Sequence, residues 1–181
     1  LLGPITNPAG AARQVVGVGD PAAAPRLAEV LRALGTERAL VVHGTGLDEL
    51  PLDGSGVSHD VTPAGVERRT VDPAALGLAR AESAAFAGGD PGDNAALVEG
   101  VLDGSDRGPR RDVVLLNAAA AFVAAGRSAD LGAGVVLAAA TLDGGAASRL
   151  LARLRAEKAA VDRVRAAAPE VTACRPPLPR P

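Results

Sequence analysis

The sequence predicts an α/β domain, in which a partial mixed sheet is flanked by helices. Residues 14–43 hold two short apolar runs around one helical segment, which is the length of a parallel strand–helix–strand unit. Two more strand-like runs follow at 57–71, and residues 93–165 then carry apolar side chains at helical spacing. The 181 residues correspond to one ordinary domain.

The first part of the chain alternates strand and helix signals. Residues 1–12 contain prolines and glycines and predict a loop, and Gln14–Val18 predicts a buried strand. Asp20 is a good helix N-cap and Pro21 suits the first helical position, so we expect a helix from Pro21 to Leu34. The spacing places four apolar residues on its buried face: Leu27, Val30, Leu31 and Leu34.

The next segments predict three strands and then helices. Arg38–His43 is a second buried strand, and Val57–Val61 and Val66–Val71 form a pair joined by a turn at Pro63–Gly65. Residues 72–92 predict irregular structure. Four helices are expected after it: Asp93–Leu102, Arg111–Ala125, Asp130–Leu142 and Ala146–Arg165.

The C-terminal end has a different composition. Pro169–Pro181 holds five of the 14 prolines and the only cysteine, Cys174, and predicts a disordered tail. We therefore expect an incomplete α/β domain over 1–155, and a helix end with a Pro- and Arg-rich tail over 156–181.

Composition excludes several classes of protein. The balance of 19 Lys and Arg against 21 Asp and Glu argues against a nucleic-acid surface, and one cysteine excludes an internal disulfide framework. No membrane span and no signal peptide are expected. The first residue is Leu1 rather than Met, which suggests that the natural chain begins earlier. With no Trp, Tyr or Met and only two Phe, the core must consist mainly of Leu, Val and closely packed Ala.

The segment His43–Leu50 is the main candidate for chemistry. It is a glycine-rich loop that leaves a buried strand and carries two adjacent carboxylates, Asp48 and Glu49. Ligands of open α/β sheets bind at the carboxyl ends of strands. Magnesium is usually held by one or two carboxylates together with substrate phosphates. Asp48 and Glu49 could therefore hold Mg²⁺ on a phosphorylated substrate, or form a solvated acidic turn.

The remaining candidates favour structural roles. Gly17–Asp20 before a helix could cradle a phosphate, but the third glycine of the dinucleotide fingerprint is absent, and a tight turn is expected. His43 and His59 have no ligand partners in the sequence pattern, and His43 is expected to be packed and hydrogen-bonded. Asn94 is expected to cap a helix or bond to a loop, and Asn117 needs a structural hydrogen-bond partner if it is buried. The pair Arg110–Arg111 is expected to be a solvated cap at a helix start.

Several segments together resemble the anthranilate phosphoribosyltransferase family. Leu2–Ala9 reads Leu-Gly-Pro-Ile-Thr-Asn-Pro-Ala, and Val41–Leu50 reads Val-Val-His-Gly-Thr-Gly-Leu-Asp-Glu-Leu. The other matching segments, in chain order, are Arg13–Val18, Gly88–Pro91, Asn94–Ala95 and Gly108–Ala120. The resemblance covers about residues 1–155.

The resemblance implies a function and a fold. Family members transfer a phosphoribosyl group from phosphoribosyl pyrophosphate to anthranilate, with Mg²⁺, in tryptophan biosynthesis. It implies the large α/β domain of the nucleoside phosphorylase and phosphoribosyltransferase fold, a cytoplasmic protein and a possible homodimer. The Asp-Glu pair that binds magnesium in the family maps onto Asp48 and Glu49.

This chain departs from the family pattern in what it lacks. The Gly-Thr-Gly-Gly-Asp phosphate loop, the Lys-His-Gly-Asn motif, the anthranilate-binding arginine and the N-terminal helices are not in it. We therefore expect the isolated chain to be inactive, and the catalytic and substrate-binding residues stay unassigned. The alternatives are a truncated binding or assembly module, and a relative of pyrimidine nucleoside phosphorylase, against which the Gly-Pro-x-Thr-Asn-Pro segment speaks.

Overall fold

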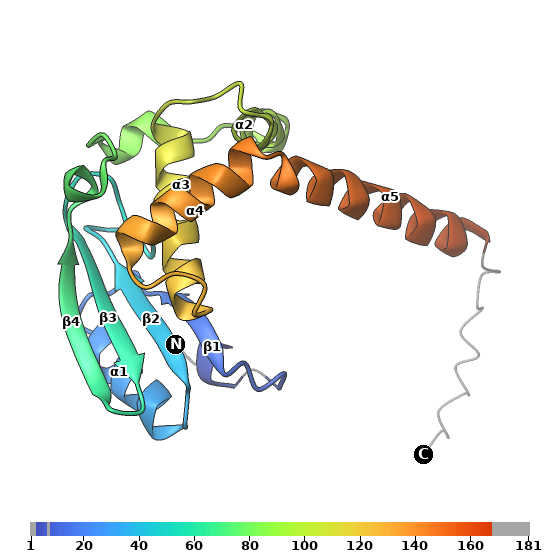
Figure 1. Ribbon diagram of the computed structural model, residues 1–181. Coiled ribbons are helices and arrows are strands. Elements are labelled where there is room, and N and C mark those ends of the chain that lie inside the picture. Colours follow the sequence, from blue (N-terminus) through green and yellow to red (C-terminus); the bar gives the residue numbers. More distant parts are fainter. Residues whose placement is uncertain (1–2, 7, 168–181) are drawn as a thin grey trace, which may run out of the picture.

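A four-stranded mixed sheet forms the centre of the computed structural model, which describes residues 3–6 and 8–167 (Figure 1). The strands lie in the order β1-β2-β3-β4. The first pair, β1 and β2, is parallel, and the two later pairs are antiparallel. The expected mixed sheet is thus confirmed. The strands are β1 (Arg13–Gly17), β2 (Arg38–His43), β3 (Gly56–Thr62) and β4 (Gly65–Val71).

The helix α1 (Ala24–Ala33) connects the two parallel strands. It begins three residues later than predicted, because Pro25 has no N–H with which to bond the carbonyl of Pro21. Asp20 still accepts a hydrogen bond from the backbone of Ala22 at 3.0 Å, but it caps a turn rather than the helix. The predicted buried face is half wrong, since Leu27 and Leu31 are buried whereas two further members are exposed: Val30 and Leu34.

The predicted helices of the second half are present, with shifted ends: α2 (Pro91–Asp103), α3 (Pro109–Ala124), α4 (Leu131–Asp143) and α5 (Ala146–Ala167). α2 starts earlier than predicted because Asp90 and Asp93 form a capping box, each side chain accepting a bond from the other's backbone. Within the segment predicted as irregular, two short 3₁₀ helices form, Pro73–Leu76 and Ser83–Phe86, and residues 1–12 contain a third, Gly3–Ile5. The predicted tail Pro169–Pro181 lies outside the described residues.

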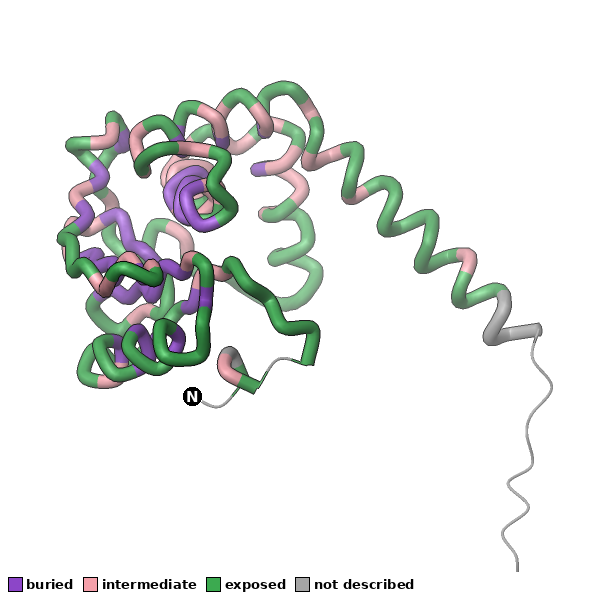
Figure 2. The backbone as a smooth tube through the Cα atoms, turned by 60° about the horizontal axis from the view of Figure 1, so that its bottom comes forward, coloured by how far each residue is buried: buried purple, intermediate pink, exposed green. Residues whose placement is uncertain are grey.

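Two hydrophobic cores lie on opposite faces of the sheet. α1 covers one face, where Val16, Val41 and Val61 are buried. α3 and α4 cover the other, where the core contains Leu40, Leu116 and further buried residues (Figures 1 and 2). The buried part of the chain is thus concentrated in the sheet and its two helical layers, while α5 is largely exposed.

Close contact between α3 and α4 depends on a glycine. A Cβ placed on Gly134 would lie 2.8 Å from the Cβ of Ala119 and 3.0 Å from its carbonyl oxygen. Such distances are shorter than van der Waals contact, so only a residue without a side chain lets the helix axes approach this far. The tight, Ala-rich helix packing expected from composition is confirmed at this contact.

We predict that Gly134→Val destabilises the fold. Forcing extra methyl groups into a packed contact costs about 1–3 kcal/mol, which exceeds the few tenths that valine gains over glycine in helix propensity. Gly132→Val is the matched control, since a Cβ there meets only atoms at 3.4 Å or more. Urea unfolding followed by circular dichroism measures both variants, and equal stabilities would contradict this account of the α3–α4 contact.

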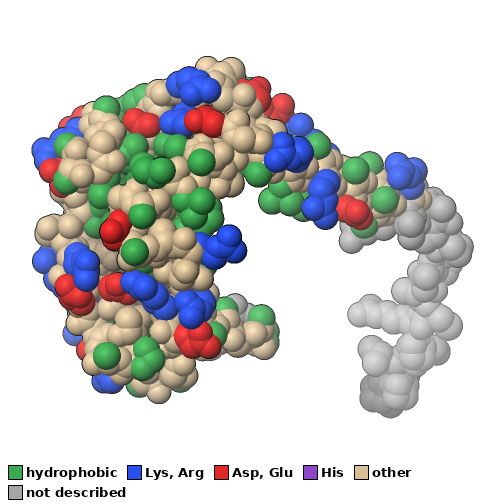
Figure 3. Space-filling view, in the orientation of Figure 1, with side chains coloured by type: hydrophobic (Ala, Val, Ile, Leu, Met, Phe, Trp, Pro, Cys, Tyr) green, Lys and Arg blue, Asp and Glu red, His purple; other side chains and the backbone are tan. Residues whose placement is uncertain are grey.

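α5 extends away from the body of the protein (Figure 1). It exposes apolar side chains along its length, namely Leu150, Leu154 and Val161. No single described helix is long and apolar enough to cross a membrane; α4 and residues up to Arg163 of α5 pass that test only as a pair bent by 57°. Figure 3 shows positive and negative side chains mixed over the visible face rather than gathered in one patch.

Candidate functional site

The loop that follows β2 turns sharply and presents two acidic side chains. The backbone N–H of Gly44 donates to the carbonyl of Leu47 at 3.0 Å, and Gly46 has a φ of +73°, which favours glycine. Asp48 and Glu49, the two residues after Leu47, are exposed, while Leu50 is fully buried. The loop therefore places both carboxylates in solvent directly beside a buried anchor.

The side chain of Asn117 in α3 fixes the backbone of this loop by hydrogen bonds. Its side-chain oxygen accepts the N–H of Leu50 at 3.0 Å, and its amide nitrogen donates to the carbonyl of Leu50 at 2.9 Å. The same nitrogen donates to the carbonyl of Val113 within its own helix at 3.0 Å. The predicted structural role of Asn117 is confirmed, and its partner is the backbone next to the acidic pair.

The end of β1 supports the loop from the other side. A Cβ on Gly17 would lie 1.7 Å from the carbonyl oxygen of Asp48, so no other residue fits without moving the backbone. The two glycine-rich segments singled out in the sequence therefore meet in the structure. Gly17 does not form a phosphate cradle at a helix start, because residues 21–23 form a turn before α1.

A cavity of about 460 Å³ opens beside the two carboxylates. Arg110 lines it, and the buried Nε of this arginine has no hydrogen-bond partner; its Nη1 lies 3.7 Å from Asp106. The cavity thus combines an apolar wall, a cation and an acidic loop, which is the composition of a small-molecule site. Its lining comes from the acidic loop, α2, α3 and the segment before α2, and includes Leu47, Asp48, Glu49, Phe86, Asn94, Val98, Arg110 and Val114.

The acidic pair fits magnesium as a partial ligand set. Asp48 and Glu49 supply oxygen ligands, and neither forms an ion pair within the described part of the chain. No group of three or more His, Cys, Asp or Glu that could hold a metal occurs among the described residues. Water and a phosphorylated substrate would have to complete the shell, which is the usual arrangement for Mg²⁺.

Three other sequence candidates have structural roles. Asn94 accepts the N–H of Gly89 at 2.9 Å and donates to its carbonyl at 3.1 Å, so it fixes the loop before α2 as expected. Arg111 is not the solvated cap that was predicted, because its side chain is largely buried and pairs with Asp143 at 3.0 Å. Cys174 lies outside the described residues.

The two histidines form a buried pair that the sequence pattern did not reveal. His43 of β2 and His59 of β3 are both buried, with ring centroids 6.2 Å apart. Burial lowers the pKa of His59 below its usual value, and the neighbouring His43 and Arg68 add to the effect. The pKa of His43 is lowered mainly by burial and then by Arg68. The packed role predicted for His43 is confirmed.

This pair predicts a loss of stability in mild acid. Because the folded-state pKa values are lowered, the unfolded chain binds more protons as pH falls below about 6.5, and the free energy of unfolding decreases in that window. The stability that the neutral histidines allow is fully present at pH 7.5, and it is lost as pH falls through their folded-state pKa values. Urea unfolding of wild type and His59→Gln at pH 7.5, 6.5 and 5.5 tests this.

The comparison of wild type with His59→Gln separates the effect of His59 from that of other titrating groups. Both proteins contain the same carboxylates, including Asp112, whose pKa is raised by burial. We expect a smaller decrease in stability for His59→Gln than for wild type. Parallel pH profiles for the two proteins would show that the buried pair does not control the acid response.

Comparisons with known proteins place the chain in a family. Residues 1–148 match the model of the glycosyl transferase family, a/b domain. Anthranilate phosphoribosyltransferase of Roseiflexus sp. is 52% identical over 156 residues, and that of Natronomonas pharaonis is 47% identical over 155. These alignments cover 85% and 86% of this chain but 46% of each relative. The chain thus spans about half the length of the curated relatives it matches.

Solved structures agree with the sequence relatives and with the expected fold. Anthranilate phosphoribosyltransferase from Thermus thermophilus superposes with a TM-score of 0.76 at 45% identity, over 84% of this chain and 45% of that one. The enzyme from Saccharomyces cerevisiae, in complex with PRPP and Mg, gives 0.68 at 26% identity, over 76% and 40%. The resemblance drawn from the motifs is confirmed. With residues 1–148 matched by its model, the chain belongs to the glycosyl transferase family, as an α/β domain of that family.

Proposed function

We propose that this chain is the α/β part of an enzyme that transfers a phosphoribosyl group from phosphoribosyl pyrophosphate to the amine of anthranilate. The observation that carries the proposal is the acidic loop, which lies beside a cavity and is held in place by Asn117 and Gly17. The chain is also 52% identical, over 156 residues, to an anthranilate phosphoribosyltransferase. A yeast relative is described in complex with PRPP and Mg, and another structure of it contains 4-fluoroanthranilate.

In the proposed reaction, the anthranilate nitrogen attacks C1′ of the ribose, and the bond from C1′ to the pyrophosphate oxygen breaks. The pyrophosphate leaves with the electron pair of that bond, and the amine loses a proton. Bound Mg²⁺ would neutralise the charge of the departing pyrophosphate. Asp48 and Glu49 would hold the ion, while the bonds from Asn117 to Leu50 keep the two carboxylates in place.

Arg110 has a supporting role in this proposal. Arg110 lines the same cavity as the acidic pair, and its buried Nε has no hydrogen-bond partner within the described part of the chain. A cation placed here can attract an anionic group of a substrate that enters the cavity. Neither histidine is assigned a part in the chemistry, since both are buried in the sheet.

Activity should require a second segment. β1 is an edge strand of the described sheet, bonded along one side only to β2, and its C-terminal Gly17 touches the candidate site. The matched relatives are about twice as long as this chain. We infer that a complementary half supplies the remaining phosphate-binding and anthranilate-binding groups, and that the complete protein is a cytoplasmic enzyme, as the resemblance implies; a homodimer remains an expectation.

A chimera tests the proposed function. The Roseiflexus relative is 52% identical to this chain over the part that the two share. Its other, N-terminal half is fused ahead of residue 1. Loss of anthranilate fluorescence with phosphoribosyl pyrophosphate and Mg²⁺ measures the transfer. We expect activity from the chimera and none from the 181-residue chain alone. A folded chimera without activity would contradict the proposed function and favour a binding or assembly module, whereas phosphorolysis of a pyrimidine nucleoside would favour the other enzyme class.

A further inference from the structure

A second cavity, of about 370 Å³, lies on the side of the sheet that α3 and α4 cover, and it shares no lining residue with the cavity beside the acidic loop. It extends along the strands from Arg38, at the start of β2, to Ser58, which pairs with Val42 near the end of β2. Its walls are the face of β2, β3 and β4 and the start of α4. The residues that line it include Arg38, Leu40, Ser58, Asp60, Arg69, Val71, Leu76, Val123, Asp130 and Leu131.

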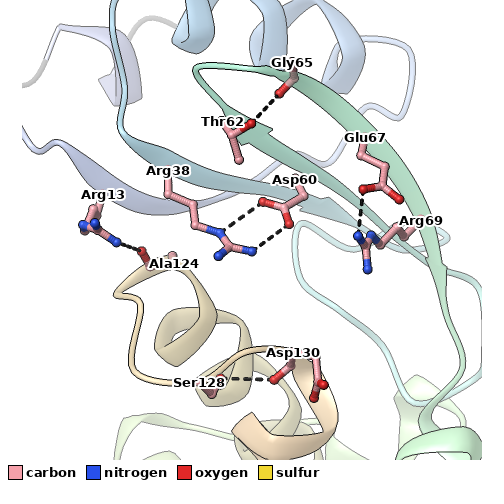
Figure 4. A network of polar contacts seen from close by, with 10 residues as sticks. All are labelled: Arg13, Arg38, Asp60, Thr62, Gly65, Glu67, Arg69, Ala124, Ser128 and Asp130. Atoms are coloured by element: carbon pink, nitrogen blue, oxygen red, sulfur yellow. Dashed lines mark hydrogen bonds and ion pairs between the residues drawn. The ribbon is translucent and has the colours of Figure 1, made fainter.

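Most charges around this cavity are already paired within the protein. Arg38 donates to both oxygens of Asp60, at 2.8 and 3.3 Å, and the pair is mostly buried (Figure 4). Arg69 donates through one terminal nitrogen to Glu67 at 2.7 Å. These bonds leave the Nη1 of Arg38 and the other nitrogens of Arg69 without a partner among the described residues.

Ser58 of β3 presents a hydroxyl group to the cavity. Its side chain lines the cavity, the residue is only 3% exposed, and its hydroxyl forms no hydrogen bond within the described part of the chain. Ser58 lies opposite Arg69 in the pairing of β3 with β4, so the hydroxyl and the guanidinium share one face of the sheet. Together they form a donor pair suited to a carboxylate.

The facing wall carries the opposite charge. Asp130 uses one carboxylate oxygen to cap α4, accepting the N–H of Ala133 at 2.8 Å, and has a second oxygen to offer. Figure 4 shows Asp130 beside Ser128 at the start of α4, on the helical side of the strands that carry Arg38 and Arg69. Between these polar ends the lining is apolar, from Leu40, Val71, Leu76, Val123 and Leu131.

We propose that this cavity binds a small zwitterion with an apolar body, of the class of apolar α-amino acids. The carboxylate accepts hydrogen bonds from Ser58 and Arg69, the ammonium group pairs with Asp130, and the side chain lies on the apolar lining. The volume is within the range of small-molecule sites, at the lower end. Because the two cavities share no lining residue, this site does not depend on the proposed transferase activity.

Three probes of one shape test the proposal on the 181-residue chain: L-phenylalanine, phenethylamine, which lacks the carboxylate, and 3-phenylpropionate, which lacks the amine. Isothermal titration calorimetry measures each dissociation constant. We expect L-phenylalanine to bind at least tenfold more tightly than either partial analogue. Equal binding of the three probes, or no binding of any, would overturn the proposal.

Variants localise the binding. Asp130→Asn keeps a capping side chain and removes the charge, so it should reduce the affinity for L-phenylalanine to that for 3-phenylpropionate. Arg69→Gln and Ser58→Ala should each raise the dissociation constant of L-phenylalanine at least fivefold. Arg32→Gln, which changes an exposed arginine of α1, is the matched control and should leave it unchanged. Unchanged affinity in Asp130→Asn and Arg69→Gln, both at exposed positions that leave the core intact, would place the ligand elsewhere and refute the assignment.

Discussion

Replacing the acidic pair by its amides, Asp48→Asn with Glu49→Gln, is expected to reduce phosphoribosyl transfer by the chimera about 100-fold or more. The substitutions keep the size and hydrogen-bonding shape of both side chains but remove the charges that would hold Mg²⁺. Loss of a group that stabilises developing charge on the leaving group typically costs about 10²–10³ in rate. Both residues are exposed, so the fold itself should be unaffected.

A binding measurement separates this result from a general loss of activity. Mg²⁺ should raise the melting temperature of the chimera when pyrophosphate is present, and the double variant should lose that increase. Asp103→Asn, an exposed carboxylate at the end of α2, is the control and should keep both the rate and the shift. Full activity in the double variant would show that the acidic loop does not hold the metal.

Substituting Gly17 is expected to have the second large effect. In Gly17→Val, the Cβ would occupy the position of the Asp48 carbonyl oxygen, 1.7 Å away, so β1 or the acidic loop must move. We expect a stability loss of about 1–3 kcal/mol from overpacking. In the chimera we also expect at least a tenfold lower transfer rate, because a shift of about 1 Å in a positioning element can cost 10²-fold.

Gly19→Val is the matched control for this variant. A Cβ at Gly19 meets nothing within 4 Å, and this glycine has no positive φ that a side chain would strain. The control tests whether any valine in the β1–α1 connection is harmful. If both variants behave as wild type in urea unfolding and in the fluorescence assay, the contact between Gly17 and Asp48 does not position the loop.

Local sequence signals were enough for most of the elements. The apolar run Arg38–His43 was predicted with the bounds that the structure has, because a fully buried strand needs a continuous apolar stretch. Helix starts were less accurate where two signals competed. Asp20 and Pro21 indicated one start, but Pro25 imposed a later one, since a proline cannot donate the hydrogen bond that the earlier helix requires.

The acidic pair could be found from its sequence neighbourhood, but its support could not. Asp48 and Glu49 follow a strand directly, so their place at a strand end is local information. Asn117 is 67 residues away from Leu50, and Arg110 meets the acidic loop only when α3 packs beside it. Asn117 carried a weak signal, as a polar residue in an Ala-rich helix that must find a partner.

What the sequence by itself determined is the set of elements, the acidic loop and the family resemblance, because each depends on residues near one another in the chain. Only the tertiary structure decided which distant groups meet. It placed Gly17 against the carbonyl of Asp48, His43 beside His59, and both Ser58 and Asp130 in the lining of one cavity. The physical reason is that strand register and helix packing set these distances, and both are properties of the whole fold rather than of any short segment.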